Sequence, residues 1–437
     1  MTIETKLPFG TDFVSSFSKE MGEPSWLEAL RVKALNSADN LPLPRPDKTK
    51  IDKWNFSQFN QHTVKSEPYA SLSELPEEVK ALIGDIESAN KNLYIQRNQT
   101  PAYLRLSDEL KNQGVIFTDI FTAARNHGEL LEKYFMTKAI KADEHRLAAL
   151  HAALFNGGAF LYVPKNVEIK EPIQAVYIHD QPEANLFNHV IVVADDNSSV
   201  VYVENYISTL DSTNNVFNIA TEVIANTNAK IQYGAVDYLA KGIITYVNRR
   251  GVAARDARIE WALGLMNEGN TISENTTNLV GDGAYGDTKT VVVGRGEQTQ
   301  NFTTKVVHFG KHTEGYILNH GVMKDSASSV FNGIGKIEHG ASKSNAEQES
   351  RVLMLSEKAR GDANPILLID EDDVMAGHAA SVGRVDPVQL YYLMSRGIKK
   401  AEAERLIIHG FLAPVVNQLP IEGVKKQLTE VIERKVR

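Results

Sequence analysis

The pattern of hydrophobic and polar positions changes twice along the chain, and each change marks a region boundary. Up to residue 156, apolar residues recur mainly at helical spacing, as in Trp26, Leu27 and Leu30. From 157 to 375, short runs of Val, Ile, Thr and Tyr alternate with Asn, Asp and Gly, which is typical of many short strands. From 376 to 437 the spacing is helical again. We therefore predict a mostly helical N-terminal region, a β core and a C-terminal helical domain.

Two elements stand out in the N-terminal region. The β-formers between Tyr94 and Leu106 predict a hairpin or a pair of strands. A long helix is expected after Thr137, because Leu147, Leu150 and Leu154 follow at helical spacing. The dipeptide Gly157-Gly158 is expected to end that helix.

In the central region, small or β-prone residues recur about every 14 residues, shortly after a turn former. One such unit holds a strand and a turn, so two units, about 28 residues, make one coil of a β-helix with two long faces. A meander or a β-sandwich also produces regular turn signals and is the alternative. We expect a mainly β protein whose right-handed β-helix (solenoid) core is flanked by an N-terminal helical/α+β region and a small C-terminal helical bundle. The repeat positions are Ala229, Ile243, Ala257, Thr271, Tyr285, Thr299, Thr313, Ala327 and Ala341.

The last region begins with a well-marked helix. Asp386-Pro387 is a helix start, because a capping side chain precedes a proline in the first turn, and Gly397 is a suitable stop. Two further helices follow, and their apolar stripes exceed what a small bundle can bury, which predicts docking onto another surface. The apolar residues are Leu390, Tyr391, Leu393 and Met394, then Leu406, Ile407 and Phe411, then Ile421, Val424, Leu428, Val431 and Ile432.

Composition narrows the function classes. The net charge of −8 and the lack of a basic block argue against nucleic acid as the main partner. No apolar run approaches the roughly 20 residues that a membrane helix needs. The start, MTIETKLPFG, lacks the basic and apolar parts of a signal peptide, so we expect a cytoplasmic protein.

The chain contains no cysteine. This excludes disulfides, thiol nucleophiles, cysteine-bound zinc and any iron–sulfur site held by this chain alone, because thiolates are the main ligands of such clusters. Any metal role must use His, Asp or Glu, or ligands from a partner.

Familiar catalytic motifs are missing, and two weaker groupings remain. Neither a phosphate loop, a G-x-S-x-G elbow nor H-E-x-x-H occurs. Three histidines in VVHFGKHTEGYILNHG, namely His308, His312 and His320, could supply imidazole ligands, although turn and surface histidines are common. Charged residues along one solenoid face could imitate a polysaccharide lyase, although such charges usually form a solvated face: Asp282, Asp287, Lys289 and Arg295.

The most informative histidine is His378, in the stretch DVMAGHAASVGRVDPVQLYYLMSRG from Asp373 to Gly397. Small residues surround it: Ala376, Gly377, Ala379, Ala380, Ser381 and Gly383. Small residues allow another backbone to approach closely, and imidazole is a versatile ligand and proton carrier. This stretch is therefore a candidate contact surface with a chemically useful group.

The same stretch, with AEAERLIIHGF after it, resembles the C-terminal signature of the SufB/SufD family. The similarity extends to Glu23-Pro-x-Trp-Leu, to Leu41-Pro-Leu-Pro and to Gly158-x-Phe-Leu-Tyr-Val-Pro, so it covers nearly the whole chain. Val382-Gly383 is similar to the SufD type, whereas the SufB type tends to have Ser-Lys-Ile there. The matching positions are Asp372, Asp373, Val374, His378, Ala380, Val382, Gly383, Tyr392, Leu393, Ser395, Arg396, Gly397 and Ile398.

The resemblance implies a non-catalytic cytosolic subunit of the SUF iron–sulfur cluster assembly machine, supporting cluster assembly and iron acquisition. Its β-helix edge would pair with a SufB-like scaffold, and its C-terminal helices would dock on a SufC-like ABC ATPase. The family's interface histidine maps onto His378, opposite a cysteine and a carboxylate of the scaffold. The implied ATPase-docking candidates are Tyr391, Tyr392, Met394, Arg396, Gly397 and Phe411.

Departures from the family pattern refine this expectation. Ala376 and Gly377 stand where many relatives have Cys and Ser, and Ala379 stands where Gly is usual. A thiol role is thereby excluded, leaving imidazole as the ligand of this subunit. The resemblance implies a transient iron–sulfur cluster shared with a partner, and no tightly bound cofactor or metal of the chain's own. Nothing in the sequence decides whether a flavin binds or whether the chain forms homodimers. The alternative function is a stand-alone β-helix carbohydrate-active enzyme.

Overall fold

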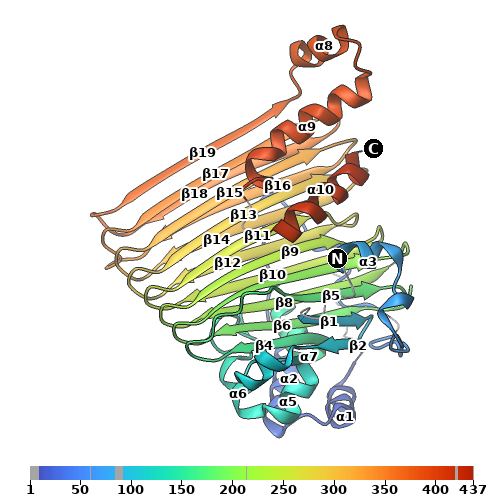
Figure 1. The fold of residues 1–437 in the computed structure, drawn as a ribbon, viewed down its shortest axis with the longest axis vertical. Helices are drawn as coiled ribbons and strands as arrows, with labels where there is room; N and C mark the ends of the chain where they lie inside the picture. The colour runs from blue at the N-terminus through green and yellow to red at the C-terminus, as the bar shows by residue number, and fades with distance from the viewer. Residues whose placement is uncertain (1–8, 60, 84–91, 213, 419–421, 437) are drawn as a thin grey trace.

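Two long sheets face each other in the computed structural model, which describes residues 9–59, 61–83, 92–212, 214–418 and 422–436. Successive strands of the central region alternate between the sheets, so the chain winds as a β-solenoid and the predicted fold class is confirmed (Figure 1). In spatial order, sheet A contains β2 (Thr100–Arg105), β1 (Asn92–Arg97), β5 (Ile173–His179), β7 (Ser199–Ser208), β9 (Lys230–Tyr238), β11 (Arg258–Leu265), β13 (Tyr285–Gly294), β15 (Glu314–Met323), β17 (Asn345–Met354) and β19 (Met375–Arg384). Sheet B contains β3 (Ile116–Asp119), β4 (Gly157–Val163), β6 (Leu186–Ala194), β8 (Asn215–Ala225), β10 (Ile243–Ala253), β12 (Thr271–Leu279), β14 (Thr299–His308), β16 (Ser328–Ile337) and β18 (Arg360–Ile369).

One corner of each coil has a turn residue with a positive φ, and these residues follow the repeat. They are 27 to 31 residues apart, which agrees with the predicted 28-residue coil. Left-handed backbone favours Gly, Asn and Asp, and this explains the Asn, Asp and Gly content of the central region. Small repeat residues such as Ala229 and Ala257 are fully buried at the corners beside these turns. The positive-φ residues are Asn166, Asn197, Asn228, Asp256, Gly283, His312 and Lys343.

Strand residues alternate between the solenoid interior, here called the lumen, and the two outer faces. The lumen holds the main apolar core, with large side chains such as Trp261, Tyr233 and Phe302 buried between the sheets. Parallel pairing stacks equivalent positions of successive coils in register, so residues of one kind form rows along the solenoid axis.

Most helices of the N-terminal region cover the outer face of sheet B at one end of the solenoid, whereas the helix Glu77–Ile83 packs on the outer face of sheet A (Figure 1). The predicted pair of strands within Tyr94–Leu106 is the antiparallel hairpin β1–β2. The prediction of a long helix after Thr137 is wrong. A nine-residue helix begins only at Arg146, where the His145 ring accepts a hydrogen bond from the Ala148 amide at 3.1 Å and caps the first turn. The helices are α1 (Thr11–Met21), α2 (Ser25–Ala38), η1 (Leu72–Glu74), α3 (Glu77–Ile83), α4 (Asp108–Asn112), α5 (Ile120–Asn126), α6 (Gly128–Tyr134) and α7 (Arg146–Leu154).

Three C-terminal helices follow β19, namely α8 (Pro387–Ser395), α9 (Lys400–Val416) and α10 (Glu422–Val436). The apolar stripes of α9 and α10 pack on the outer face of sheet A, so most of their apolar surface is covered by the chain's own strands. Helix α8 has no buried residue and projects beyond the end of the sheet (Figure 1). Strand β19 crosses the boundary predicted at 375/376, so His378 lies in the sheet and not in the helical part.

Candidate functional site

Strand β19 forms the free edge of sheet A. Its ten residues pair with β17 on one side, and no described residue pairs with the other side. The N–H groups of Met375 and Val385 donate to β17 or its flank, at 2.9 and 3.3 Å. Because strand amides alternate in direction, the amides of the intervening even-numbered residues, His378 and Ala380 among them, face the open side. The edge therefore presents a row of unpaired backbone groups.

The neighbouring free edge, β18 in sheet B, is less able to pair. Pro365 lies in the middle of β18 and has no amide hydrogen, which is one way in which proteins block pairing at an edge. Strand β19 contains no proline between Met375 and Arg384. At this end of the solenoid, β19 is thus the edge suited to accept a further strand.

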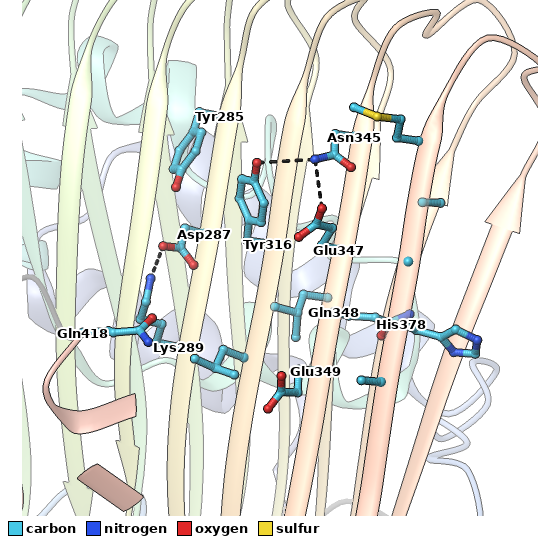
Figure 2. A pocket seen from close by; sticks show the side chains of 16 residues that line it. Tyr285, Asp287, Lys289, Tyr316, Asn345, Glu347, Gln348, Glu349, His378 and Gln418 are labelled. Carbon is cyan, nitrogen blue, oxygen red and sulfur yellow. Dashed lines mark hydrogen bonds and ion pairs between the residues drawn. The ribbon is translucent and has the colours of Figure 1, made fainter. Parts of the chain in front are cut away.

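His378 lies near the middle of this edge, in register with Gln348 of β17. Alternation places both side chains on the lumen side, and Figure 2 shows them projecting away from the carboxylates of Glu347 and Glu349. Gln348 is buried and donates to the Ile366 carbonyl at 2.8 Å, whereas His378 is exposed because no further coil covers it. The imidazole therefore sits at the open end of the lumen.

The neighbours of His378 leave space for a second chain. An added Cβ at Gly377 or Gly383 would meet no atom within 4 Å. Ala376, Ala379 and Ala380 are exposed. The packing therefore leaves room for the predicted close-contact surface around this histidine, which stays a prediction.

A shallow groove of about 590 Å³ runs along the outer face of sheet A beside the edge (Figure 2). Tyr285 and Tyr316 line it with their rings 5.7 Å apart, and the Glu347 carboxylate accepts from the Asn345 amide at 3.4 Å. Asp287 is paired with Lys289, and burial raises the pKa of the Asp287 carboxyl. Tyr285 was predicted only as a repeat position, and Tyr316 was not predicted. The two tyrosines are not in register, because Tyr285 is aligned with Glu314 and Tyr316 with Asp287, so no shared repeat position marks them.

The predicted ATPase-docking residues divide between two environments. On α8, Tyr391, Tyr392 and Met394 are 73%, 55% and 43% exposed. The Arg396 guanidinium lies over the Tyr392 ring, 5.2 Å from its centroid, and Gly397 ends the helix with a φ of 86°. The remaining residue, Phe411, is half-buried.

Phe411 belongs to α9 and stacks on His320 of β15 with ring centroids 4.9 Å apart. It therefore fixes α9 to the sheet, and its ring is partly occupied by this contact. Among the predicted ATPase-docking residues, the exposed apolar side chains are therefore those on α8.

The second histidine group does not converge. His308 points into the lumen and contacts the Thr313 hydroxyl at 2.8 Å, and burial lowers the pKa of its ring to about 4. His312 occupies a positive-φ turn, and His320 lies on the outer face, where Nδ1 contacts the Phe411 carbonyl at 3.0 Å. Across the described ranges, no group of three or more His, Cys, Asp or Glu side chains is arranged to hold a metal.

The charges considered for a lyase site are likewise separated. Asp282 accepts from the Lys311 amide in the turn of the next coil at 2.8 Å. Arg295 pairs with Glu268 at 2.9 Å near the opposite ends of the strands. Of these four residues, only Asp287 and Lys289 contact each other. In the part of the chain that the structure describes, no helix is long and apolar enough to cross a membrane.

Comparison with known proteins places this architecture in a family. The family model for the SufBD core domain, described as SUF system FeS cluster assembly, matches residues 177–411, and the model for the SufBD N-terminal region matches residues 19–175. The iron–sulfur cluster assembly protein SufD of Bacillus subtilis is 71% identical over 100% of both chains. SufBD family proteins of Staphylococcus saprophyticus and Staphylococcus aureus are 29% and 28% identical over 94% of this chain and 90% of theirs. The chain therefore belongs to the SufB/SufD family of iron–sulfur cluster assembly proteins.

Proposed function

We propose that this protein is a non-catalytic subunit of a SUF complex, pairing through β19 with a SufB-like scaffold and through α8 with a SufC-like ATPase. The observation that carries the proposal is the uncovered ten-residue edge of β19, with His378 on it and the exposed helix α8 directly after it. A partner strand added to this edge would satisfy the outward amides and extend sheet A into the partner.

Apolar surface is concentrated at the same end. Leu368, Ile369, Met375 and Val382 are 45%, 42%, 67% and 42% exposed, and all lie on the two terminal strands. Exposed apolar residues gathered around a free edge are typical of an interaction surface. Since α9 and α10 lie on the outer face of the sheet, none of the described helices covers this edge.

At the proposed interface, His378 would supply one imidazole to an iron–sulfur cluster that is assembled between the two proteins. This chain has no thiolate, so the cysteine ligands would come from the scaffold. Cluster binding requires deprotonated thiols and a neutral imidazole, so assembly would release protons at this position. The cluster is treated as cargo of the assembly reaction and not as a resident cofactor.

A proline scan of β19 tests the pairing. Ala380→Pro removes an outward-facing amide and leaves the amides bonded to β17, whereas Ala380→Val keeps every amide. Co-purification with the SufB-like partner should be lost for the proline variant and retained for the valine variant. Equal co-purification of both variants would argue against strand pairing at this edge.

The role of His378 is tested in the reconstituted complex. His378→Ala should slow cluster formation, measured by iron–sulfur absorbance, without weakening co-purification. His339→Ala is the control, because His339 is a turn histidine whose side chain is 93% exposed. Wild-type cluster formation by the His378 variant would remove this residue from the site.

The contribution of α8 is tested by binding to the ATPase. Tyr391→Ala should weaken SufC-like binding by about 2 kcal/mol, as expected for an aromatic residue at the centre of an interface. Phe309→Ala removes a ring that is 46% exposed but lies in a distant turn, so it should leave affinity unchanged. Equal affinities of the two variants would place the ATPase elsewhere.

A second copy of this chain is the other partner that the same edge could accept. Sedimentation of the chain, alone and with the SufB-like scaffold, distinguishes a homodimer from a complex with the scaffold. No arrangement of the described residues favours the carbohydrate-active alternative, because its candidate charges are paired or apart.

A further inference from the structure

A row of polar side chains runs through the otherwise apolar lumen. Register pairing aligns Arg249 of β10 with Asn275 of β12 and Asn275 with Thr304 of β14 on sheet B. On sheet A, Asn319 of β15 is in register with Ser350 of β17. We call this row the lumen stripe, and it consists of Arg249, Asn275, Thr304, Asn319, Ser350 and Gln348.

Hydrogen bonds connect the stripe across the two sheets. The Thr304 hydroxyl donates to Asn319 Oδ1 at 3.4 Å, and Asn319 Nδ2 donates to Ser350 Oγ at 3.3 Å. The Thr288 hydroxyl donates to Asn275 Oδ1 at 3.4 Å. These distances are long for direct hydrogen bonds, so the side chains only partly satisfy one another.

The two ends of the stripe differ in chemistry. At one end Gln348 lies in register with His378, where the lumen opens. At the other end the Arg249 guanidinium holds two carboxylates, Asp237 at 2.8 and 3.0 Å and Glu204 at 3.1 Å. This ion cluster is fully buried and has one cation for two carboxylates.

Several buried polar atoms along the stripe have no partner among the described residues. They are Arg249 Nε, Asn275 Nδ2 and Gln348 Oε1 of the stripe, and Oγ1 of Thr290, which is in register with Asn319. The four side chains are between 0% and 6% exposed. Buried polar atoms in native proteins are nearly always hydrogen-bonded, and internal water commonly supplies the missing bond. The spacing of these atoms over several coils indicates a line of water positions and not one isolated site.

We propose that the lumen stripe binds a file of water molecules that gives protons a route from solvent at the open end of the lumen, beside Gln348, to the buried carboxylates Glu204 and Asp237. Passing one proton from a hydronium ion at the open end to a carboxylate leaves water and a carboxylic acid, so atoms and charge balance. Two carboxylates beside one guanidinium carry a net negative charge, and one added proton neutralises it. Burial also favours proton uptake at this cluster, because it raises the pKa of Glu204 to about 7.

Such a route has a use if the proposed function holds. A partner strand on β19 would cover His378 and exclude bulk water, while cluster binding releases protons there. The file would then connect the covered site with an internal proton acceptor. The existence of the file is a property of the chain alone and is tested without any partner.

The indole of Trp261 reports on water in the lumen. Its N–H donates to the Thr277 hydroxyl at 2.9 Å, and the side chain is 1% exposed between the ion cluster and Thr304. The double variant Thr304→Val with Asn319→Leu replaces the middle of the stripe with apolar groups. Ile317→Leu is the control, because it changes the same lumen face of β15 without changing polarity.

Exchange of the Trp261 indole hydrogen in D₂O, followed by NMR on the isolated full chain, should slow about tenfold in the double variant and stay unchanged in the control. Equal exchange in wild type and double variant would overturn the route. A crystal structure of the wild-type chain that resolves ordered water provides an independent readout, also where the double variant fails to fold. Water bonded to Asn275 Nδ2, Thr290 Oγ1 and Gln348 Oε1 is expected, and a dry lumen at these atoms would overturn the proposal.

Discussion

Helix α10 is anchored to the sheet by a buried lysine, and the packing of this helix therefore depends on pH. Lys435 is fully buried, and its ammonium donates to the carbonyls of Met266 and Asn267 at 2.8 and 3.0 Å. The Glu268 carboxylate lies 3.8 Å away. Burial is the main cause that lowers the pKa of Lys435 to about 7, against 10.5 for an ordinary lysine. The folded chain therefore releases this proton well before the unfolded chain does.

The sign and size of the effect follow from proton linkage. Between pH 7 and 10.5 the unfolded state binds more protons at this residue, so the stability of the docked helix rises with pH across that window. Below pH 7 both states are protonated, and the contribution becomes constant. Integrating between pH 7 and 9 gives a gain of about 2 kcal/mol from Lys435.

Hydrogen exchange measured by mass spectrometry on α10 peptides tests this prediction at pH 7, 8 and 9, after correction for intrinsic exchange. The opening free energy of wild type should rise by about 2 kcal/mol relative to Lys435→Met, which cannot titrate. Lys426→Met, an exposed lysine on the same helix, should behave like wild type. If wild type and Lys435→Met show the same pH dependence, the ammonium is not the titrating group and the reasoning fails.

Two further changes test the packing of the helices. Gly264→Ala would place a Cβ 2.5 Å from Leu428 Cδ1, so it should destabilise the packing of α10 on the sheet by about 1–3 kcal/mol in the same exchange experiment. Gly377→Ala is the control and should have little effect, because its Cβ would meet no atom within 4 Å. Arg31→Met leaves the Glu23 carboxylate buried without its partner, bonded at 2.6 Å, and should lower the free energy of unfolding by about 3–5 kcal/mol in urea titrations. Unchanged midpoints for Arg31→Met would show that Glu23 finds another partner.

The solenoid was predictable because its turns have strict backbone requirements. Positive-φ positions recur once per coil and favour Asn, Asp or Gly, and the corners need small buried residues such as Ala257 and Ala327. Because of these constraints, turn-forming and small residues recur in the sequence at regular intervals. His312 and Lys343 occupy the same turn position without belonging to that residue class, so the signal fades toward the C-terminal coils.

The last strand, β19, was not predicted from the sequence because its composition is unusual. Strand β19 contains mainly Ala, Gly and Ser where other strands carry Val, Ile and Thr, so its sequence lacks a strand pattern. Its conformation is imposed by register with β17. The family resemblance covers this stretch and makes His378 a candidate, which stays a prediction. The pairing of Arg249 with Glu204 and Asp237 was not predicted, because it depends on how β7, β9 and β10 come together in the fold.

The covalent connection between β19 and α8 has a mechanical consequence. Only Val385 and Asp386 separate the end of the strand from the first residue of the helix, and Asp386 caps that helix through the Val388 amide at 2.8 Å. A connection this short has no slack to absorb a displacement. A load applied to α8 would therefore be transmitted along the backbone of β19 as a shear on its hydrogen bonds, with His378 carried on the loaded strand.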